Sequence, residues 1–170
     1  IDTQLDINQI AEHLTMLGIE VDSIKSSVPP FSGVVLGKVF DIEKHPNADK
    51  LLLCKVDIGL ELNIICGAKN VEKNMLVACA LEGAVLPSGI KIKKTKMRGL
   101  TSEGMLCSEK ELGISDIDNG IMSIDVAYNN FLGKDLRDLL DLDEKILDLK
   151  ITPNRGDCLS VRGIARELST

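Results

Sequence analysis

A run of basic side chains between residues 91 and 98 is the first feature of this sequence that could do chemistry. The segment KIKKTKMR contains five cations and no acid: Lys91, Lys93, Lys94, Lys96 and Arg98. The whole chain has a formal net charge of -6 and a pI near 5.0, so this local positive charge is exceptional. Such side chains neutralise phosphates, and the acidic remainder would confine phosphate contact to this segment. The alternative is a solvated edge strand that lysines protect from aggregation.

The parity of the basic run predicts where its backbone changes direction. In IKIK (residues 90–93) isoleucines and lysines alternate, as in a strand with one buried face. Lys96 and Arg98 continue the parity of the isoleucines, so the chain must turn, bulge or leave the sheet near Lys94–Thr95. Single-strand binders usually add aromatic stacking platforms, but the segment from 34 to 112 offers only Phe40. We therefore expect weak binding through charge and shape.

The segment SEGMLCS (residues 102–108) raises the possibility of a nucleophile, Cys107 or Ser108. Such a group needs a base and an orienting acid, and the two histidines, His13 and His45, lie in a helical pattern and before a proline turn. The glycine spacing also differs from that of a nucleophile elbow. We interpret the segment as a turn at Gly104 followed by a core strand, and we predict no catalytic residue.

The five cysteines indicate a reduced, cytoplasmic protein. Their number is odd, there is no CxxC pair, and four of the five lie in apolar, strand-like runs. Isolated histidines and cysteines argue against zinc, so we predict no metal site. No apolar run approaches the ~20 residues of a membrane span, and no secretory signal is visible, so no membrane partner is expected.

Two kinds of sequence pattern surround and contain the basic run, one in the middle of the chain and one at its ends. The middle has short apolar runs separated by Gly, Pro and Asn, which predicts strands in VVLGKVFDIEK, KLLLCKVDIG, LNIICGA, MLVACAL, IKIK and GMLCS. The ends mix helix and strand: a helix with a capping box at Asp6 and Gln9, strands in IEVDSI and KILDLKI, a short helix in LGKDLRDLLDL, and a final helix with Asp157 as N-cap. The pattern is typical of a small barrel inserted into a second domain.

The middle motifs resemble the tRNA-binding domain, an OB-type barrel attached to several tRNA synthetases and tRNA-handling proteins. The resemblance is carried by HPNADKLLLCKVDIG, IICGAKNV, LEGAVLPSGIKIKKTKMRG and SEGMLCSEKELGI, and it covers roughly Val34 to Ile114. The flanks DINQIAEHLTMLGIEVDSI and ITPNRGDCLSVRGIARELS resemble the segments that surround this barrel in the β subunit of bacterial phenylalanine–tRNA ligase. In the second flank Gly156 replaces a proline that is frequent in that family.

The resemblance implies an α+β fold in which a five-stranded OB-type β-barrel is inserted into a small split α/β domain formed by the two termini. Residues 1–33 and 145–170 would form the split domain, incomplete at both ends, and residues 34–144 the tRNA-binding domain with an acidic extension. The parent enzyme would attach phenylalanine to tRNA(Phe) using ATP and Mg²⁺, but this fragment would be non-catalytic and hold no cofactor. Its expected partners are tRNA, the α subunit and the remaining β-subunit domains of an α2β2 enzyme, with no DNA.

The resemblance also carries over a candidate tRNA-binding face. It comprises the five basic residues together with two possible phosphate hydrogen-bonders, Ser102 and Ser108. Two alternatives stay open: a purely structural module that packs against other synthetase domains, and a free-standing tRNA-binding protein.

Overall fold

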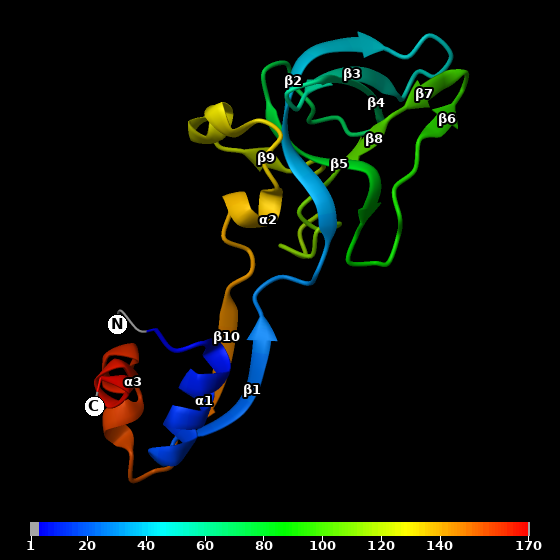
Figure 1. The fold of residues 1–170 in the computed structure, drawn as a ribbon. Coiled ribbons are helices and arrows are strands. Elements are labelled where there is room, and N and C mark those ends of the chain that lie inside the picture. The colour runs from blue at the N-terminus through cyan, green and yellow to red at the C-terminus, as the bar shows by residue number, and fades with distance from the viewer. Residues whose placement is uncertain (1–3, 170) are drawn as a thin grey trace. The chain divides into compact units, whose positions relative to one another are not determined.

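The chain folds into two compact units in the computed structural model, which describes residues 4–169. The smaller unit combines the two ends of the described chain, up to Ser27 and from Glu144, and the larger unit comprises Val28–Asp143. Antiparallel strands dominate the structure and helices are few, so the chain is α+β (Figure 1). None of the helices in the described part combines the length and apolar character needed to cross a bilayer.

In the smaller unit two helices accompany a two-stranded antiparallel sheet. Its elements are α1 (Ile7–Met16), β1 (Glu20–Ser26), β10 (Lys145–Lys150), the 3-10 helix η2 (Gly156–Cys158) and α3 (Val161–Leu168). The buried side chains are Leu14, Ile19 and Cys158, and Val21 of β1 and Leu147 and Leu149 of β10 pack against them. This small core is built from residues at both ends of the sequence.

The helix starts show one confirmed and one wrong prediction. The Asp6 carboxylate accepts the N–H groups of Asn8 and Gln9, and the Gln9 side chain accepts the N–H of Asp6, which confirms the capping box. The predicted N-cap Asp157 is wrong, because its carboxylate pairs with Arg155. Ser160 caps α3 instead, by accepting the N–H of Gly163 at 3.1 Å.

The larger unit is organised around a curled, six-stranded antiparallel sheet. Its path is β4-β3-β2-β5-β8, with β9 also paired to β5, and β6 and β7 form a separate hairpin. The bounds are β2 (Ser32–Lys44), β3 (Leu52–Asp57), β4 (Glu61–Cys66), β5 (Leu76–Val85), β6 (Thr95–Met97), β7 (Leu100–Ser102), β8 (Gly104–Leu106) and β9 (Ser123–Ile124). The acidic segment that follows contains the 3-10 helix η1 (Val126–Phe131) and α2 (Leu136–Leu139).

The first and last strands of the sheet path, β4 and β8, approach each other. The N–H of Glu103 donates to the carbonyl oxygen of Asn63 in β4 at 2.9 Å. The predicted strand at 90–93 is formed only in part: residues 90–92 make three backbone hydrogen bonds with residues 83–86 and one bridge, Lys91 with Val85, before the chain leaves the sheet. The predicted break near Lys94–Thr95 is confirmed, since β6 begins at Thr95 in a different sheet.

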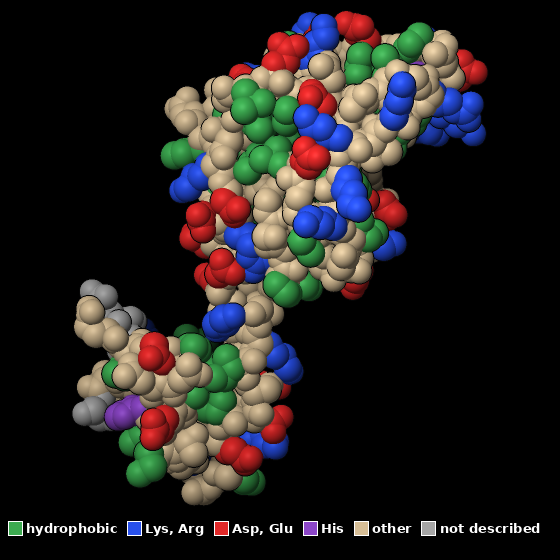
Figure 2. Space-filling model, turned by 45° about the vertical axis from the view of Figure 1, so that its right-hand side comes forward, with side chains coloured by type: hydrophobic (Ala, Val, Ile, Leu, Met, Phe, Trp, Pro, Cys, Tyr) green, Lys and Arg blue, Asp and Glu red, His purple; other side chains and the backbone are tan. Residues whose placement is uncertain are grey.

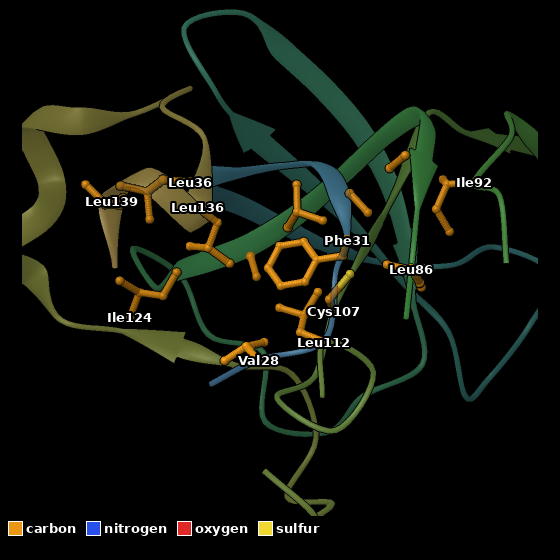
Figure 3. Close-up of a cluster of buried hydrophobic side chains, with 14 of the residues drawn as sticks. Val28, Phe31, Leu36, Leu86, Ile92, Cys107, Leu112, Ile124, Leu136 and Leu139 are labelled. Atoms are coloured by element: carbon orange, nitrogen blue, oxygen red, sulfur yellow. The ribbon is translucent and has the colours of Figure 1, made fainter. Parts of the chain in front are cut away.

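Both faces of the sheet are buried in the larger unit. Alternate residues of β5 point into different cores: Ala78 and Ala80 into one, Val77 and Cys79 into the other. Figure 3 shows the first core, in which Phe31 lies among Leu36, Leu112 and Leu136. Because almost no aromatic residues are present, branched aliphatic and cysteine side chains fill these cores.

Candidate nucleic-acid interface

The basic run leads into the hairpin of β6 and β7, which carries Lys96 and Arg98. Met97 and Leu100 form its last pair, and the two residues between them, Arg98 and Gly99, have φ angles of 50° and 100°. Positive φ at both central positions is the signature of a type I′ turn, which glycine favours at the second position. Arg98 therefore lies at the tip of a tight hairpin, in an exposed position.

The loop between β2 and β3 anchors the hairpin. The buried His45 ring contacts the Met97 carbonyl oxygen through Nε2 at 3.2 Å, and the Asn47 side-chain amide donates to the Arg98 carbonyl oxygen at 3.2 Å. Since Nδ1 of His45 accepts the N–H of Asn47, the ring proton is assigned to Nε2. His45 is a structural hydrogen-bonder, as the proline turn indicated, and it holds the hairpin on the larger unit.

The five predicted basic residues are all exposed. Lys94 is paired with Glu103, with 3.6 Å between Nζ and Oε1. Within the described residues the other four cations have no acidic partner at ion-pair distance: Lys91, Lys93, Lys96 and Arg98. Figure 2 shows Lys and Arg side chains gathered at the upper right of the larger unit, the side on which Figure 1 draws β6 and β7. These cations are therefore available to phosphate groups.

The two predicted serines are buried, so their hydroxyls do not share the exposed face of the five basic residues. Ser102 is 3% exposed, and its hydroxyl accepts the N–H of Ile65 at 3.0 Å and donates to the carbonyl oxygen of Gly104 at 2.8 Å. Ser108 is 7% exposed, and its hydroxyl is engaged by the carboxylate and the N–H of Glu111. We therefore remove both serines from the phosphate-binding set, because their hydroxyls already have partners inside the fold.

Two further lysines, missed in the sequence, border a groove beside the hairpin. A cavity of about 500 Å³ is lined by Lys50, Lys69 and one acid, Asp49, together with Leu52, Gly67 and Ala68. Gly67 and Ala68 also line a neighbouring cavity of about 420 Å³. Neither lysine belongs to the basic run, but they lie within the quoted motifs HPNADKLLLCKVDIG and IICGAKNV, which was the available signal.

The candidate nucleophiles Cys107 and Ser108 lack the partners that a hydrolase requires. Burial raises the pKa of Cys79 and of Cys107 to about 12. A hydrogen bond with Cys54 and the N–H of Ala68, 3.4 Å from Sγ, lower the pKa of Cys66. Neither histidine in the described chain contacts Cys107 or Ser108, so the base that such a mechanism requires is missing there.

One cluster has the composition of a metal site. Ligand atoms of Asp157, Cys158 and Glu167 lie within 4.8 Å of one another. The Arg155 guanidinium contacts all three side chains, at 3.3, 3.0 and 2.9 Å respectively, and also donates to the carbonyl oxygen of Leu17. A fixed cation thus balances the carboxylates, and the cluster is an ion-pair network that links α3 to the end of α1.

Comparisons with known proteins show which family the chain matches. The family model described as "Putative tRNA binding domain" matches residues 34–130, which include the hairpin and both lysines of the groove. The chain is 48% identical over 170 residues to the phenylalanine–tRNA ligase beta subunit of Mannheimia succiniciproducens, and 48% identical over 171 residues to that of Neisseria meningitidis. Each match covers 99% of this chain and 21% or 22% of the relative.

A weaker structural likeness was also found. The solved structure of a MetRS related protein from Pyrococcus horikoshii aligns with 59% of this chain and 84% of its own, with 22% identity and a TM-score of 0.41.

The chain belongs to the tRNA-binding domain family, since the family model covers more than half of it. Over nearly its full length it is similar to beta subunits of phenylalanine–tRNA ligase. The chain spans about a fifth of the length of these relatives.

Proposed function

We propose that this chain is a non-catalytic tRNA-binding and assembly region of a phenylalanine–tRNA ligase β subunit. The larger unit would be a five-stranded OB-type barrel, inserted into a split domain that corresponds to the smaller unit. The parent enzyme would charge tRNA(Phe) in the cytoplasm, with ATP and Mg²⁺ bound outside this chain. Its protein partners would be the α subunit and the remaining β-subunit domains.

The observation that carries this proposal is the basic hairpin within the family match. Two unpaired cations, Lys96 and Arg98, lie on a short hairpin that is anchored by His45 and Asn47, and two more, Lys91 and Lys93, lie just before it, all inside residues 34–130. Lysine and arginine contacts to phosphate give an affinity that falls steeply with salt. Similarity that extends through both flanks favours a synthetase subunit over a free-standing tRNA-binding protein.

The proposal is tested by titrating tRNA(Phe) with the 170-residue chain at two salt concentrations. If four phosphates are neutralised, affinity should fall by about 50- to 150-fold between about 50 and 200 mM salt. The triple variant Lys93→Glu/Lys96→Glu/Arg98→Glu should bind at least about tenfold more weakly at the lower salt. Its slope of log affinity against log salt should decrease by about 2 to 3.

A matched control separates local contact from net charge. Lys145→Glu/Arg162→Glu/Arg166→Glu changes three exposed basic residues of the smaller unit that have no acidic partner at ion-pair distance within the described residues, and it lowers the net charge equally. It should leave tRNA affinity within about twofold, because long-range effects are screened at these salt concentrations. Equal weakening by both triple variants, or an affinity independent of salt, would refute the binding role and favour the purely structural alternative.

A further inference from the structure

We propose that Cys66 is a modification site, at which the side chain attacks a low-molecular-weight disulfide that carries ammonium groups and becomes a mixed disulfide. The reagent would occupy the cavity of about 420 Å³ that Cys66 lines together with β8 and the loops after β4 and β8. The reaction does not depend on tRNA binding, because it needs only the folded larger unit.

Cys66 has a second thiol beside it. It pairs with Leu52, two residues before Cys54 on β3, so the two cysteines occupy diagonal positions on one face of the β3–β4 pair. Both belong to the same core, and the Cys54 thiol donates a hydrogen bond to the Cys66 sulfur. Cys54 is fully buried, whereas Cys66 borders a cavity that opens to solvent. A reagent in this cavity therefore meets Cys66 first.

The contacts of the Cys66 sulfur favour its ionised form. The hydrogen bond from Cys54 lowers the pKa of Cys66, and the N–H of Ala68, 3.4 Å from Sγ, lowers it further. Burial and the Glu111 carboxylate act in the opposite direction without cancelling this effect. Because the thiolate is the nucleophilic form of cysteine, these two donors make Cys66 reactive near neutral pH.

The other cysteines lack this combination of features. Cys79 and Cys107 are fully buried, they do not line the cavity, and burial raises the pKa of each to about 12. In the smaller unit the Cys158 sulfur is held by Arg155 and Asp157. Selective reaction at Cys66 is therefore expected.

The walls of the cavity favour a small ligand with a positive charge. Three apolar side chains contribute to its lining: Met97, Met105 and Ile121. None of its lining residues in the described chain is basic, and two are acidic, Glu111 and Asp118. Asp118 is paired with Lys110, but Glu111 is bonded only to Ser108, at 2.7 and 2.9 Å, and so has no cationic partner at ion-pair distance in the part of the chain that the structure describes. An ammonium group complements this carboxylate.

The step is a thiol–disulfide exchange. The Cys66 thiol first loses its proton to solvent, and the thiolate attacks one sulfur of the reagent R–S–S–R. The new S–S bond to Sγ forms as the S–S bond of the reagent breaks, and R–S⁻ leaves and takes up a proton from solvent. Cys66 is oxidised to the mixed disulfide and half of the reagent is reduced to R–SH, so no further oxidant is required.

The test treats the native 170-residue chain with cystamine at neutral pH and follows each cysteine by mass spectrometry of its peptides. Cys66 should be modified at least about tenfold faster than Cys79 and Cys107, because only Cys66 combines access with a thiolate. Dithiodipropionate has the same length but carries carboxylates, and it is the matched probe. After each rate is normalised to that of the denatured chain, cystamine should react with Cys66 about threefold faster or more.

A pair of variants tests the role of the neighbouring thiol. Cys54→Ala removes the donor but keeps Cys66 and the cavity, so the midpoint of the pH–rate profile of Cys66 should rise and the rate at neutral pH should fall several-fold. Cys79→Ala is the control, because it removes a buried thiol from the same core that is not bonded to Cys66. Its rate at Cys66 should stay within about twofold of the wild type.

Two results with the wild-type chain would overturn the proposal without any variant. One is equal modification of Cys66 and Cys79 in the native protein, which would mean that reaction requires unfolding. The other is an equal or faster normalised rate with dithiodipropionate, which would refute the ammonium preference of the cavity. A pH–rate profile unchanged in Cys54→Ala would also overturn it. None of these measurements involves tRNA, so the proposed function stands or fails separately.

Discussion

At the scale of single residues, position on the curled sheet decides what a hydroxyl can do. Ser102 is four residues from the exposed Arg98, yet its side chain points into the place where the two ends of the sheet path meet. There it bridges the Ile65 N–H and the Gly104 carbonyl oxygen. The adjacent Glu103 also connects the two ends of the sheet: its N–H donates to the Asn63 carbonyl oxygen, and its carboxylate accepts the Asn63 N–H. Ser102 therefore contributes to closing the sheet.

The first prediction follows from this junction. Ser102→Ala removes the only side-chain acceptor bonded to the Ile65 N–H and leaves a buried donor without its partner. The free energy of unfolding of the larger unit should fall by about 1–3 kcal/mol. Denaturant titration would measure this, and the salt slope of tRNA binding should remain that of the wild type. Weaker tRNA binding with unchanged stability would instead restore Ser102 to the phosphate-binding set, because a lost hydrogen bond from a neutral hydroxyl lowers affinity without lowering the salt slope.

The elements show which parts of the structure a sequence pattern can specify. Alternation and turn residues predicted β2, β3, β4, β5 and β8 at nearly their observed positions, because each strand is paired and has a buried face. The segment 90–93 has the same alternation but makes only one bridge, since pairing depends on where the rest of the sheet lies. Similarly, α2 spans only Leu136–Leu139, although the apolar pattern extended further.

The candidate site likewise has parts that the sequence pattern reveals and parts that depend on the folded structure. The basic run could be found because its cations lie close together in the sequence, and the departure from the sheet near Lys94–Thr95 was indicated by a parity change. Lys50 and Lys69 are nineteen residues apart, and only the pairing of β3 with β4 brings their loops to one groove. The burial of Ser102 was likewise invisible, because it arises from a contact with Ile65 that no local pattern encodes. Ser108 and Glu111 are different, because their reciprocal hydrogen bonds follow the S-x-x-E spacing of a capping box, which is a local pattern.

The approach of β8 to β5 gives a prediction at the scale of elements. A Cβ at Gly104 would lie 2.6 Å from the carbonyl oxygen of Ala80, so Gly104→Ala must push the two strands apart. We expect a loss of about 1–3 kcal/mol in the free energy of unfolding, as for other overpacked sites. Gly156→Ala is the control, since nothing lies within 4 Å of its Cβ position, and it should change stability by less than about 0.5 kcal/mol. Equal stability of both variants by thermal denaturation would contradict the tight strand contact.

At the scale of the whole molecule, the two units have separate cores and separate chemistry. The smaller unit buries Leu14, Ile19 and Cys158, and the proposed binding residues all belong to Val28–Asp143. Both termini contribute to the smaller unit, so its stability depends on residues far apart in the sequence. The larger unit has two cores of its own. We therefore expect damage to one core to leave the other unit folded.

The last prediction tests that independence. Leu14→Ala should cost about 2–5 kcal/mol within the smaller unit, because Leu14 is fully buried. Hydrogen exchange measured by mass spectrometry should show faster exchange in α1, β1, β10 and α3 and unchanged protection in β2 to β5. Affinity for tRNA should stay within about twofold of the wild type, whereas Leu36→Ala, at an equally buried position of the larger unit, should weaken it. Uniform loss of protection across both units in Leu14→Ala would show instead that the chain unfolds as one cooperative unit, and the tRNA-binding face would then depend on the core built from the two chain ends.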